Sequence, residues 1–400
     1  MHRSTDLARA GSLGARLLAL LARELPRAIE LRHVLHATPE LAHEERRTSA
    51  RIAAELQGTA IVSAAAETGL LALVGTPGVA APVAVRAELD GLPIAERTDA
   101  PFSAGGEAMH ACGHDVHMAA LVALARAAAA LGDELPAPLL AVFQPSEEAY
   151  PSGARELADG ELAAARAHAI VAAHIHPDLP WGTVALDDGA VNAASDSVEI
   201  VVEGAPSHGA YPHLGRDPIL AIAQIVVALH AQAGRRIDPL GAAVLNVGVL
   251  EAGRTENVVP DRARARISLR TLRAQDREAL REMVQEVVHG VAAAHGCRGV
   301  AELIPGEPAL ENDGQIVARA RALLAGAGFA RAPEWRSCGS DDFAFYGELA
   351  PIAMAFVGLA GAPGFAERPL HHPQLLPPDQ AVGAVARAQA LLYLAATASG

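Results

Sequence analysis

The nine residues from Met109 to His117 carry one thiol, three imidazoles and one carboxylate. This density is unusual in a chain with only 3 cysteines and 17 histidines. Gly113 separates Cys112 from His114 and permits a tight turn that directs both side chains to one point. On a helix, residues two apart diverge by about 200°. A thiolate beside an imidazole suits zinc or a neighbouring transition metal, and it also suits a cysteine nucleophile activated by histidine.

Two adjacent carboxylates, Glu147 and Glu148, follow the apolar run from Leu139 to Phe143. The run has the length of a buried strand. An isolated Glu-Glu pair is often a solvated acidic turn. At the end of a buried strand, however, one carboxylate can bind a metal while the other takes a proton from water. A thiol nucleophile needs no such pair, so these carboxylates favour the metal interpretation of Cys112.

Other polar residues also stand at or just beyond the C-terminal end of a predicted buried strand. Asp90 follows residues 83–89 and His174 follows residues 169–173. Strands that alternate with helical stretches predict a mostly parallel sheet, and open α/β sheets bind ligands at the carboxyl ends of their strands. We therefore expect these side chains to converge with the two glutamates. Taken alone, His174 could be a core histidine and His371 a surface residue.

The pattern changes from about residue 192. Residues 197–304 read as strand, helix, strand, strand, helix and strand, the order of ferredoxin-like split βαβ domains. Residues with catalytic potential return after it. The prediction is an α/β protein with a discontinuous, mostly parallel-sheet domain (residues 1–191 and 305–400) and an inserted ferredoxin-like α+β domain (residues 192–304).

Composition excludes several classes of function. A length of 400 residues predicts two domains, and a net charge of −14 argues against nucleic acid as a partner. The chain has no lysine, which excludes Schiff-base chemistry, pyridoxal phosphate attachment and P-loop phosphate binding.

Three scattered cysteines fit a reducing compartment. The apolar residues near the N-terminus recur at helical spacing, and no stretch reaches the roughly 18 apolar residues of a membrane span. We expect a soluble cytoplasmic protein without a membrane partner.

The segment from Met109 to His117 resembles the signature of the M20 metallopeptidase superfamily. The closer resemblance is to its amidohydrolase branch, which contains hippurate hydrolases, N-acyl amino acid deacetylases and auxin-conjugate hydrolases. Further segments match in the family's order and cover nearly the whole chain: Arg86–Pro93, Phe143–Glu148, His174–Pro177, Gly204–His208, Asn257–Asp261, Gly339–Phe343 and Leu370–Pro373.

The resemblance implies a site for two divalent metal ions, Zn²⁺ or Mn²⁺. Cys112 would be the bridging thiolate, and the other ligands would be His114, Glu148, His174 and His371. Glu147 would be the general base and Asp90 would orient a ligand. The spacing to Pro177 and Pro373 selects His174 and His371, with His176 and His372 as the alternatives.

Three further residues and the inserted domain also receive roles from the resemblance. His208 would stabilise the oxyanion in a neighbouring active site, and Asn257 and Arg270 would bind the substrate carboxylate or the developing charge. The inserted domain would be a lid and dimerisation domain, in a homodimer or a tetramer.

The implied activity is metal-dependent hydrolysis of the amide bond of a small N-acyl or N-aroyl amino acid. Alternatives are a metal dipeptidase, an N-carbamoyl amino acid hydrolase, or a non-catalytic binding protein on the same fold. Glu88, Gly91 and Asp341 depart from the family's usual aspartate, alanine and glutamate. These departures affect the substrate and the fine geometry rather than the proposed ligands.

Overall fold

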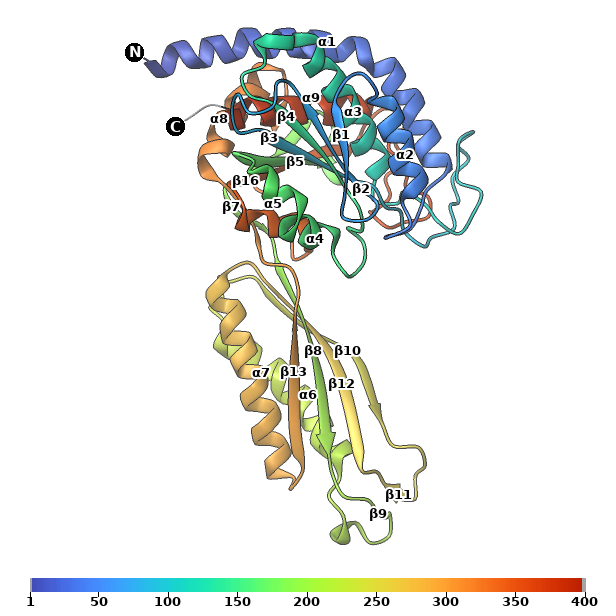
Figure 1. Cartoon of the computed structure of the whole chain (residues 1–400). Coiled ribbons are helices and arrows are strands. Elements are labelled where there is room, and N and C mark those ends of the chain that lie inside the picture. The colour runs from blue at the N-terminus through green and yellow to red at the C-terminus, as the bar shows by residue number, and fades with distance from the viewer. Residues whose placement is uncertain (1, 398–400) are drawn as a thin grey trace. The chain divides into compact units, whose positions relative to one another are not determined.

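In the computed structural model the chain forms two compact units (Figure 1). The structure describes residues 2–397. Unit 1 comprises the residues up to Gly189, Glu311–Trp335 and the residues from Phe345 onward, and unit 2 comprises Ala190–Leu310 and Arg336–Ala344. The chain leaves unit 1 within strand β7 (Gly189–Asn192) and returns within strand β14 (Leu310–Asn312).

Unit 1 is built on an eight-stranded mixed sheet with the order β1-β2-β4-β3-β5-β16-β6-β15. Its centre, β4-β3-β5-β16, is parallel, whereas β1, β2 and β6 pair antiparallel with their neighbours on the central side. Nearly every residue of the central strands is buried, as continuous apolar runs predict for a sheet covered on both faces. The strands are β1 (Ile61–Ala65), β2 (Gly69–Val74), β3 (Val83–Glu88), β4 (Leu139–Gln144), β5 (Ala169–Pro180), β6 (Thr183–Ala185), β15 (Ala330–Arg331) and β16 (Ile352–Ala360).

The helices of unit 1 include two that pack directly on the sheet and one that lies over them. Helices α3 and α9 contact the central strands, and α1 contacts α3 and α9 (Figure 1). Alanine dominates α3, so it approaches the sheet closely, and almost all of its residues are buried. The helices are α1 (His2–Ala37), α2 (Arg46–Glu55), α3 (His114–Leu131), α4 (Gly153–Asp159), α5 (Glu161–Ala165), α8 (Gly314–Gly326) and α9 (Gln380–Thr397), with 3-10 turns η1 (Gly132–Glu134) and η3 (Asp342–Glu348).

The register of the central strands brings their carboxyl ends to one level. Glu88 of β3 pairs with Gln144 of β4, and Arg86 pairs with Ala172 of β5, two residues before His174. The predicted end of the strand at residue 173 is wrong, because β5 continues to Pro180 alongside β16. His174 nevertheless lies level with Glu88 and therefore at the edge where β3 and β4 end.

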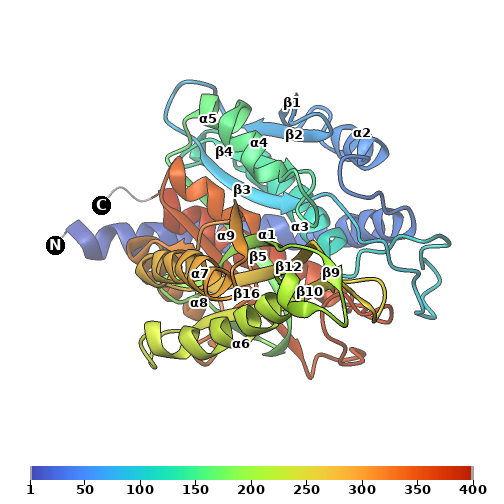
Figure 2. The same cartoon turned by 90° about the horizontal axis from the view of Figure 1, so that it is seen from below.

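Unit 2 is a four-stranded antiparallel sheet covered by two helices. The strands are β8 (Ala194–Glu203), β10 (Ala243–Ala252), β12 (Arg262–Thr271) and β13 (Arg298–Pro305), in the order β10-β12-β8-β13. Helices α6 (Pro218–Arg236) and α7 (Ala274–Ala294) lie side by side on one face (Figures 1 and 2). Buried and exposed residues alternate along β12, so the opposite face of the sheet is open. A short η2 turn (Pro212–Leu214) precedes α6.

This architecture confirms the predicted fold class, a mostly parallel α/β domain interrupted by a ferredoxin-like α+β domain. By length and composition, α3 and α6 could each cross a membrane. The apolar composition of both helices has a simpler explanation. Helix α3 is a core helix of unit 1, and α6 buries one face on the sheet of unit 2.

Candidate metal centre

The turn between Cys112 and His114 depends on glycine. Gly113 has a φ of +82°, and a Cβ there would lie 2.3 Å from Ile175 Cδ1. Only glycine combines this left-handed backbone with such close contact to β5. The turn leaves Cys112 buried and makes His114 the first residue of α3.

A hydrogen bond occupies one ring nitrogen of His114 and leaves the other available as a ligand atom. Its Nδ1 lies 2.9 Å from the Asp90 carbonyl oxygen, to which it donates. In the neutral imidazole this leaves Nε2 as the nitrogen with a lone pair. Nε2 is buried, has no hydrogen-bond partner within the part of the chain that the structure describes, and lies 3.8 Å from Glu147 Oε2. Asp90 therefore orients His114 toward the glutamate pair.

A strained turn presents Glu147 and Glu148 after β4. Ser146 has a φ of +48°, and its backbone N–H donates to Glu45 Oε1 at 2.8 Å. The Glu148 N–H donates to Asp90 Oδ2 at 2.9 Å. Two buried carboxylates, from Glu45 and Asp90, thus fix the backbone on either side of Glu147.

Two more histidines approach the thiol and Glu148. His174 Nδ1 donates to the Ile175 carbonyl at 2.6 Å, and its Nε2 lies 3.5 Å from Cys112 Sγ. The His371 N–H donates to the Ala111 carbonyl at 2.8 Å, and His371 Nε2 lies 3.2 Å from Glu148 Oε1. His371 has a φ of +63°, so the loop before α9 is bent to bring this ring to the site.

Most of these side chains form two groups that share Glu148, whereas a potential ligand atom of His174 lies within 4.8 Å of those of Glu88, His114 and His117. Potential ligand atoms of Cys112, Glu148 and His371 lie within 4.8 Å of one another, as do those of His114, Glu147 and Glu148. Two of the buried atoms, His114 Nε2 and Glu148 Oε1, form no hydrogen bond of good geometry among the described residues, although Glu148 Oε1 lies 3.2 Å from His371 Nε2. Unsatisfied buried polar atoms are costly, and a metal ion would satisfy these two as ligands. The residues present therefore fit divalent cations.

The charges of the site favour a cation as well. Burial raises the pKa of the Cys112 thiol well above its ordinary value, and the charges of Glu148, Glu147 and Glu88 raise it further. Burial alone would lower the pKa of His114, but the nearby carboxylates, led by Glu88 and Asp90, raise it to about 10. Burial and the neighbouring His117 and His114 lower the pKa of His174 well below its usual range, so this imidazole is neutral. A bound cation would compensate the clustered negative charge and stabilise the thiolate.

Hydrogen bonding separates the histidines with an open lone pair from those without one. His117 Nε2 accepts the Ile175 N–H at 3.1 Å, and its Nδ1 lies 2.8 Å from Glu88 Oε2. Both of its nitrogens are therefore occupied. His176 Nδ1 accepts from Asp178 N–H, and its ring packs against Trp335. His372 Nδ1 accepts the Gln374 N–H. In each doublet, the structure brings the chosen member, His174 or His371, to Cys112 or Glu148.

The three remaining predicted residues lie in unit 2. His208, in strand β9 (Ser207–His208), pairs with Val258 in strand β11 (Val258–Val259), and the Gly209 N–H donates to the Asn257 carbonyl at 2.7 Å. His208 and Asn257 are thus exposed neighbours near the start of β12. Arg270 lies near the end of β12, where its Nη1 donates to Ser340 Oγ at 2.7 Å. Arg262, the first residue of β12, and Arg270 are eight residues apart in the strand. This corresponds to a distance on the order of 26 Å along the strand. His208 and Arg270 of one chain therefore lie at opposite ends of the unit.

Sequence reasoning missed the buried polar residues behind the site. Glu45 is fully buried and holds both Ser146 and Thr68, although it stands among charged residues that read as a solvated helix end. Glu88 was noted in the sequence only because it replaces the family's usual aspartate. In the structure it forms hydrogen bonds with Arg86 and His117. Arg32 and His36 are buried on α1. The sequence does indicate their burial, because they stand four residues apart beside Leu31 and Leu35, on the apolar face of the helix.

Comparison with known proteins assigns the family. The chain belongs to peptidase family M20/M25/M40, whose family profile matches residues 84–393. This confirms the predicted resemblance and makes the chain a hydrolase of amide bonds.

Relatives of known name and structure cover most of the chain. It is 34% identical over 348 residues to the N-acetyl-L-cysteine deacetylase of Bacillus subtilis, covering 86% of this chain and 82% of that protein. It is 34% identical over 299 residues to the N-acetyldiaminopimelate deacetylase of Halalkalibacterium halodurans, covering 74% and 80%. The structure is similar to the YxeP protein of Bacillus subtilis, a dinuclear metal-binding peptidase of the M20 family, with 30% identity, a TM-score of 0.81, and coverage of 93% and 98%.

Proposed function

We propose that this protein is a metal-dependent amidohydrolase that cleaves the amide bond of N-acyl or N-aroyl amino acids. One observation carries the proposal: Glu147 stands beside a cluster of a thiol, a carboxylate and imidazoles suited to two divalent ions, and Glu148 is shared between its halves. The named relatives, which are deacetylases of N-acetyl amino acids, support the substrate class.

The proposed ligands are Cys112, His114, Glu148, His174 and His371, which would hold two ions of Zn²⁺ or Mn²⁺. Thiolate favours zinc, whereas carboxylate and imidazole accept either metal. When bound, the ions would polarise the substrate carbonyl and depress the pKa of a coordinated water to about 7. Their binding would displace protons from Cys112 and His114.

The chain's own residues would then move one proton. Glu147 accepts the proton of the attacking water on its carboxylate and delivers it to the departing amine nitrogen. Asp90 holds His114 and the Glu148 backbone, so the base and the proposed ligands keep their spacing. His208 would donate to the oxyanion, a contribution of roughly 3 kcal/mol. Arg270 of the same chain, and Asn257 together with His208 of the neighbouring chain, would bind the substrate carboxylate or the developing charge.

A substrate panel tests the activity. We expect metal-reconstituted protein to hydrolyse N-acetyl and N-benzoyl amino acids faster than N-carbamoyl amino acids or dipeptides, measured as kcat/KM by release of the free amino acid. A preference for dipeptides or for carbamoyl substrates would select one of the alternative hydrolases. Absence of turnover on the whole panel, with metal bound, would favour a non-catalytic binding protein.

We further propose a homodimer formed through unit 2, which would place His208 of one chain at the site of the other. Two features support it. Strand β10 ends the four-stranded sheet in the part of the chain that the structure describes, and it exposes Val244 and Leu250. Helix α6 exposes Leu220 and Val227, seven residues apart on one stripe. Exposed apolar patches of this kind mark protein interfaces.

The dimer predicts an effect of one surface substitution on assembly. Val227→Arg places a charge on a side chain that is 70% exposed, so the monomer should fold normally while association weakens. Light scattering after size exclusion should give monomers, and kcat should fall because His208 no longer reaches a partner. Ile61→Arg, at a 60% exposed position on edge strand β1, is the matched control and should stay dimeric. A dimeric Val227→Arg variant with full activity would refute this interface.

We retain the cytoplasm as the proposed location. Cys112, Cys297 and Cys338 are free thiols, as expected in a reducing compartment.

A further inference from the structure

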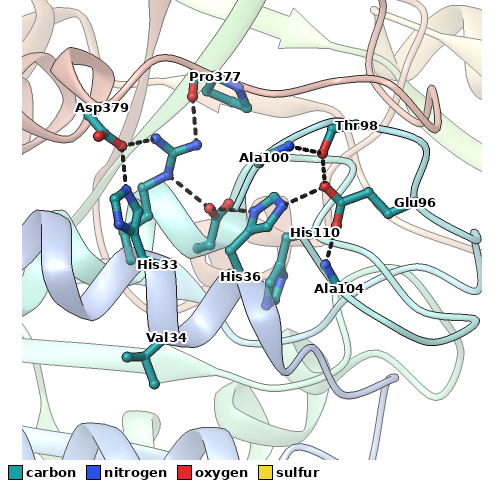
Figure 3. A network of polar contacts seen from close by, with 12 residues as sticks. His33, Val34, His36, Glu96, Thr98, Ala100, Ala104, His110, Pro377 and Asp379 are labelled. Carbon is teal, nitrogen blue, oxygen red and sulfur yellow. Dashed lines mark hydrogen bonds and ion pairs between the residues drawn. The ribbon is translucent and has the colours of Figure 1, made fainter. Parts of the chain in front are cut away.

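Helix α1 carries a buried arginine that binds two separate segments of unit 1 through three contacts. Arg32 is fully buried. Its Nε lies 3.0 Å from Asp115 Oδ2, its Nη1 lies 2.8 Å from Asp379 Oδ1, and its Nη2 lies 2.6 Å from the Pro377 carbonyl oxygen. Figure 3 shows Pro377 and Asp379 approaching the same guanidinium from the loop before α9. The planar guanidinium of Arg32 thus links α1, α3 and that loop.

His36, one turn further along α1, extends the network. Its Nδ1 lies 3.0 Å from Asp115 Oδ2, and its Nε2 lies 3.1 Å from Glu96 Oε1 (Figure 3). Glu96 in turn accepts the Ala104 N–H at 2.6 Å and the Thr98 hydroxyl. The segment from Glu96 to Ala104 leads directly into the motif that contains Cys112. The same carboxylate, Asp115, therefore serves both residues of α1.

Each segment held by Arg32 carries a proposed metal ligand. Asp115 adjoins His114 at the start of α3, and Pro377 to Asp379 lie six to eight residues after His371. His114 and His371 come from segments far apart in the sequence. The His371 N–H bonds the Ala111 carbonyl, and the Arg32 guanidinium provides a second link between the two segments through side chains.

Stability alone is a weak reason for this network. Taking an arginine and a carboxylate out of water costs several kcal/mol per ion, and a well-packed apolar replacement is often as stable. Buried ion pairs are best attested as devices that fix a geometry or register. Here the geometry concerned is the distance between two ligand-bearing segments.

We propose that Arg32 is a positioning residue of the metal centre, which holds the His114 segment and the His371 segment at the spacing that two cations require. The inference rests on the proposed ligands. Arg32 itself contacts neither ligand and acts through Asp115, Pro377 and Asp379.

The chain offers a matched control on α3, the helix that carries Asp115. Arg126 of α3 is also a nearly buried arginine, which donates to the Glu55 carbonyl at 2.8 Å and pairs with the Glu55 carboxylate. It lies eleven residues beyond Asp115, about 16 Å along the helix. Loss of Arg126 should therefore lower stability without altering the spacing of the ligands.

The test compares Zn²⁺ binding by metal-stripped wild type, Arg32→Met and Arg126→Met, titrated against a chromophoric chelator below the melting temperature of each protein. We expect both variants to lose thermal stability. Only Arg32→Met should bind Zn²⁺ more weakly, by about 10- to 100-fold, the cost usual for groups that orient ligands. Unchanged Zn²⁺ affinity in folded Arg32→Met, or an equal loss in Arg126→Met, would overturn the proposal.

Asp379→Ala keeps the experiment decisive if Arg32→Met does not fold. Alanine has no oxygen to accept from Arg32 Nη1 or His33 Nε2, and the Asp379 side chain is 39% exposed, so the substitution removes this link to α1 at small cost to folding. A loss of Zn²⁺ affinity of about threefold or more supports the positioning role, and no loss refutes it. In a folded Arg32→Met background, adding Asp379→Ala should change the affinity little, because the Arg32 link is already broken. Wild-type protein that binds no Zn²⁺ would instead refute the proposed metal centre.

Discussion

The Glu147→Gln variant should retain its metal ions and lose nearly all turnover. Glutamine has the shape of glutamate but cannot accept the proton of the attacking water. General-base catalysis contributes up to about 10⁴-fold, so kcat should fall on the order of 10³ to 10⁴-fold. KM should change little, because Glu147 is not a proposed ligand. Metal analysis and steady-state kinetics on the same preparation provide both measurements.

The neighbouring residue supplies the control. Glu148→Gln changes the same functional group one position away, but Glu148 belongs to both halves of the site. We expect this variant to lose bound metal as well as activity. If Glu147→Gln keeps its turnover with a full metal complement, or if both variants lose metal equally, the division of tasks between the two glutamates is wrong.

The shared edge of a parallel sheet explains why so much of the site could be predicted. Asp90, Glu147 and Glu148 each follow a predicted buried strand, and parallel strands bring such positions to one level. His174 was placed after its strand and instead lies within β5, yet the register keeps it level with Glu88. The error did not matter because the level along the sheet, and not the strand boundary, decides which side chains meet.

The residues behind the site were harder to predict because their partners are distant in sequence. Arg32 bonds Asp115 and Asp379, which are 83 and 347 residues away, and Ser146 N–H bonds Glu45 across 101 residues. Local periodicity indicates that a polar residue lies on a buried face, but not what satisfies it there. Likewise, the strand pattern of the inserted domain located β12 without indicating that Arg270 and His208 occupy opposite ends of the unit.

Removing the metal should abolish activity, and the Cys112→Ser variant should reproduce much of that loss. Dialysis against a chelator would leave the carboxylates of Glu148, Glu147 and Glu88 clustered around a protonated thiol. It would also leave His114 Nε2 and Glu148 Oε1 buried without a well-formed hydrogen bond in the described part of the chain. The stripped protein should melt at a lower temperature, because bound ions stabilise the folded state in proportion to their affinity. Zn²⁺ or Mn²⁺ should restore both the melting temperature and the turnover.

Serine cannot replace the thiolate, because its hydroxyl stays protonated where a metal-bound thiol ionises. Groups that merely orient ligands cost 10- to 100-fold in metal affinity, so loss of Cys112 should cost at least about 100-fold. Cys297→Ser is the matched control, since Cys297 is equally a buried free thiol but lies in the core of unit 2. It should leave Zn²⁺ affinity and kcat unchanged. If the enzyme keeps its activity after dialysis against a chelator, the hydrolysis proceeds without the proposed metal centre. If Cys112→Ser keeps normal metal content and turnover, Cys112 is a packing residue.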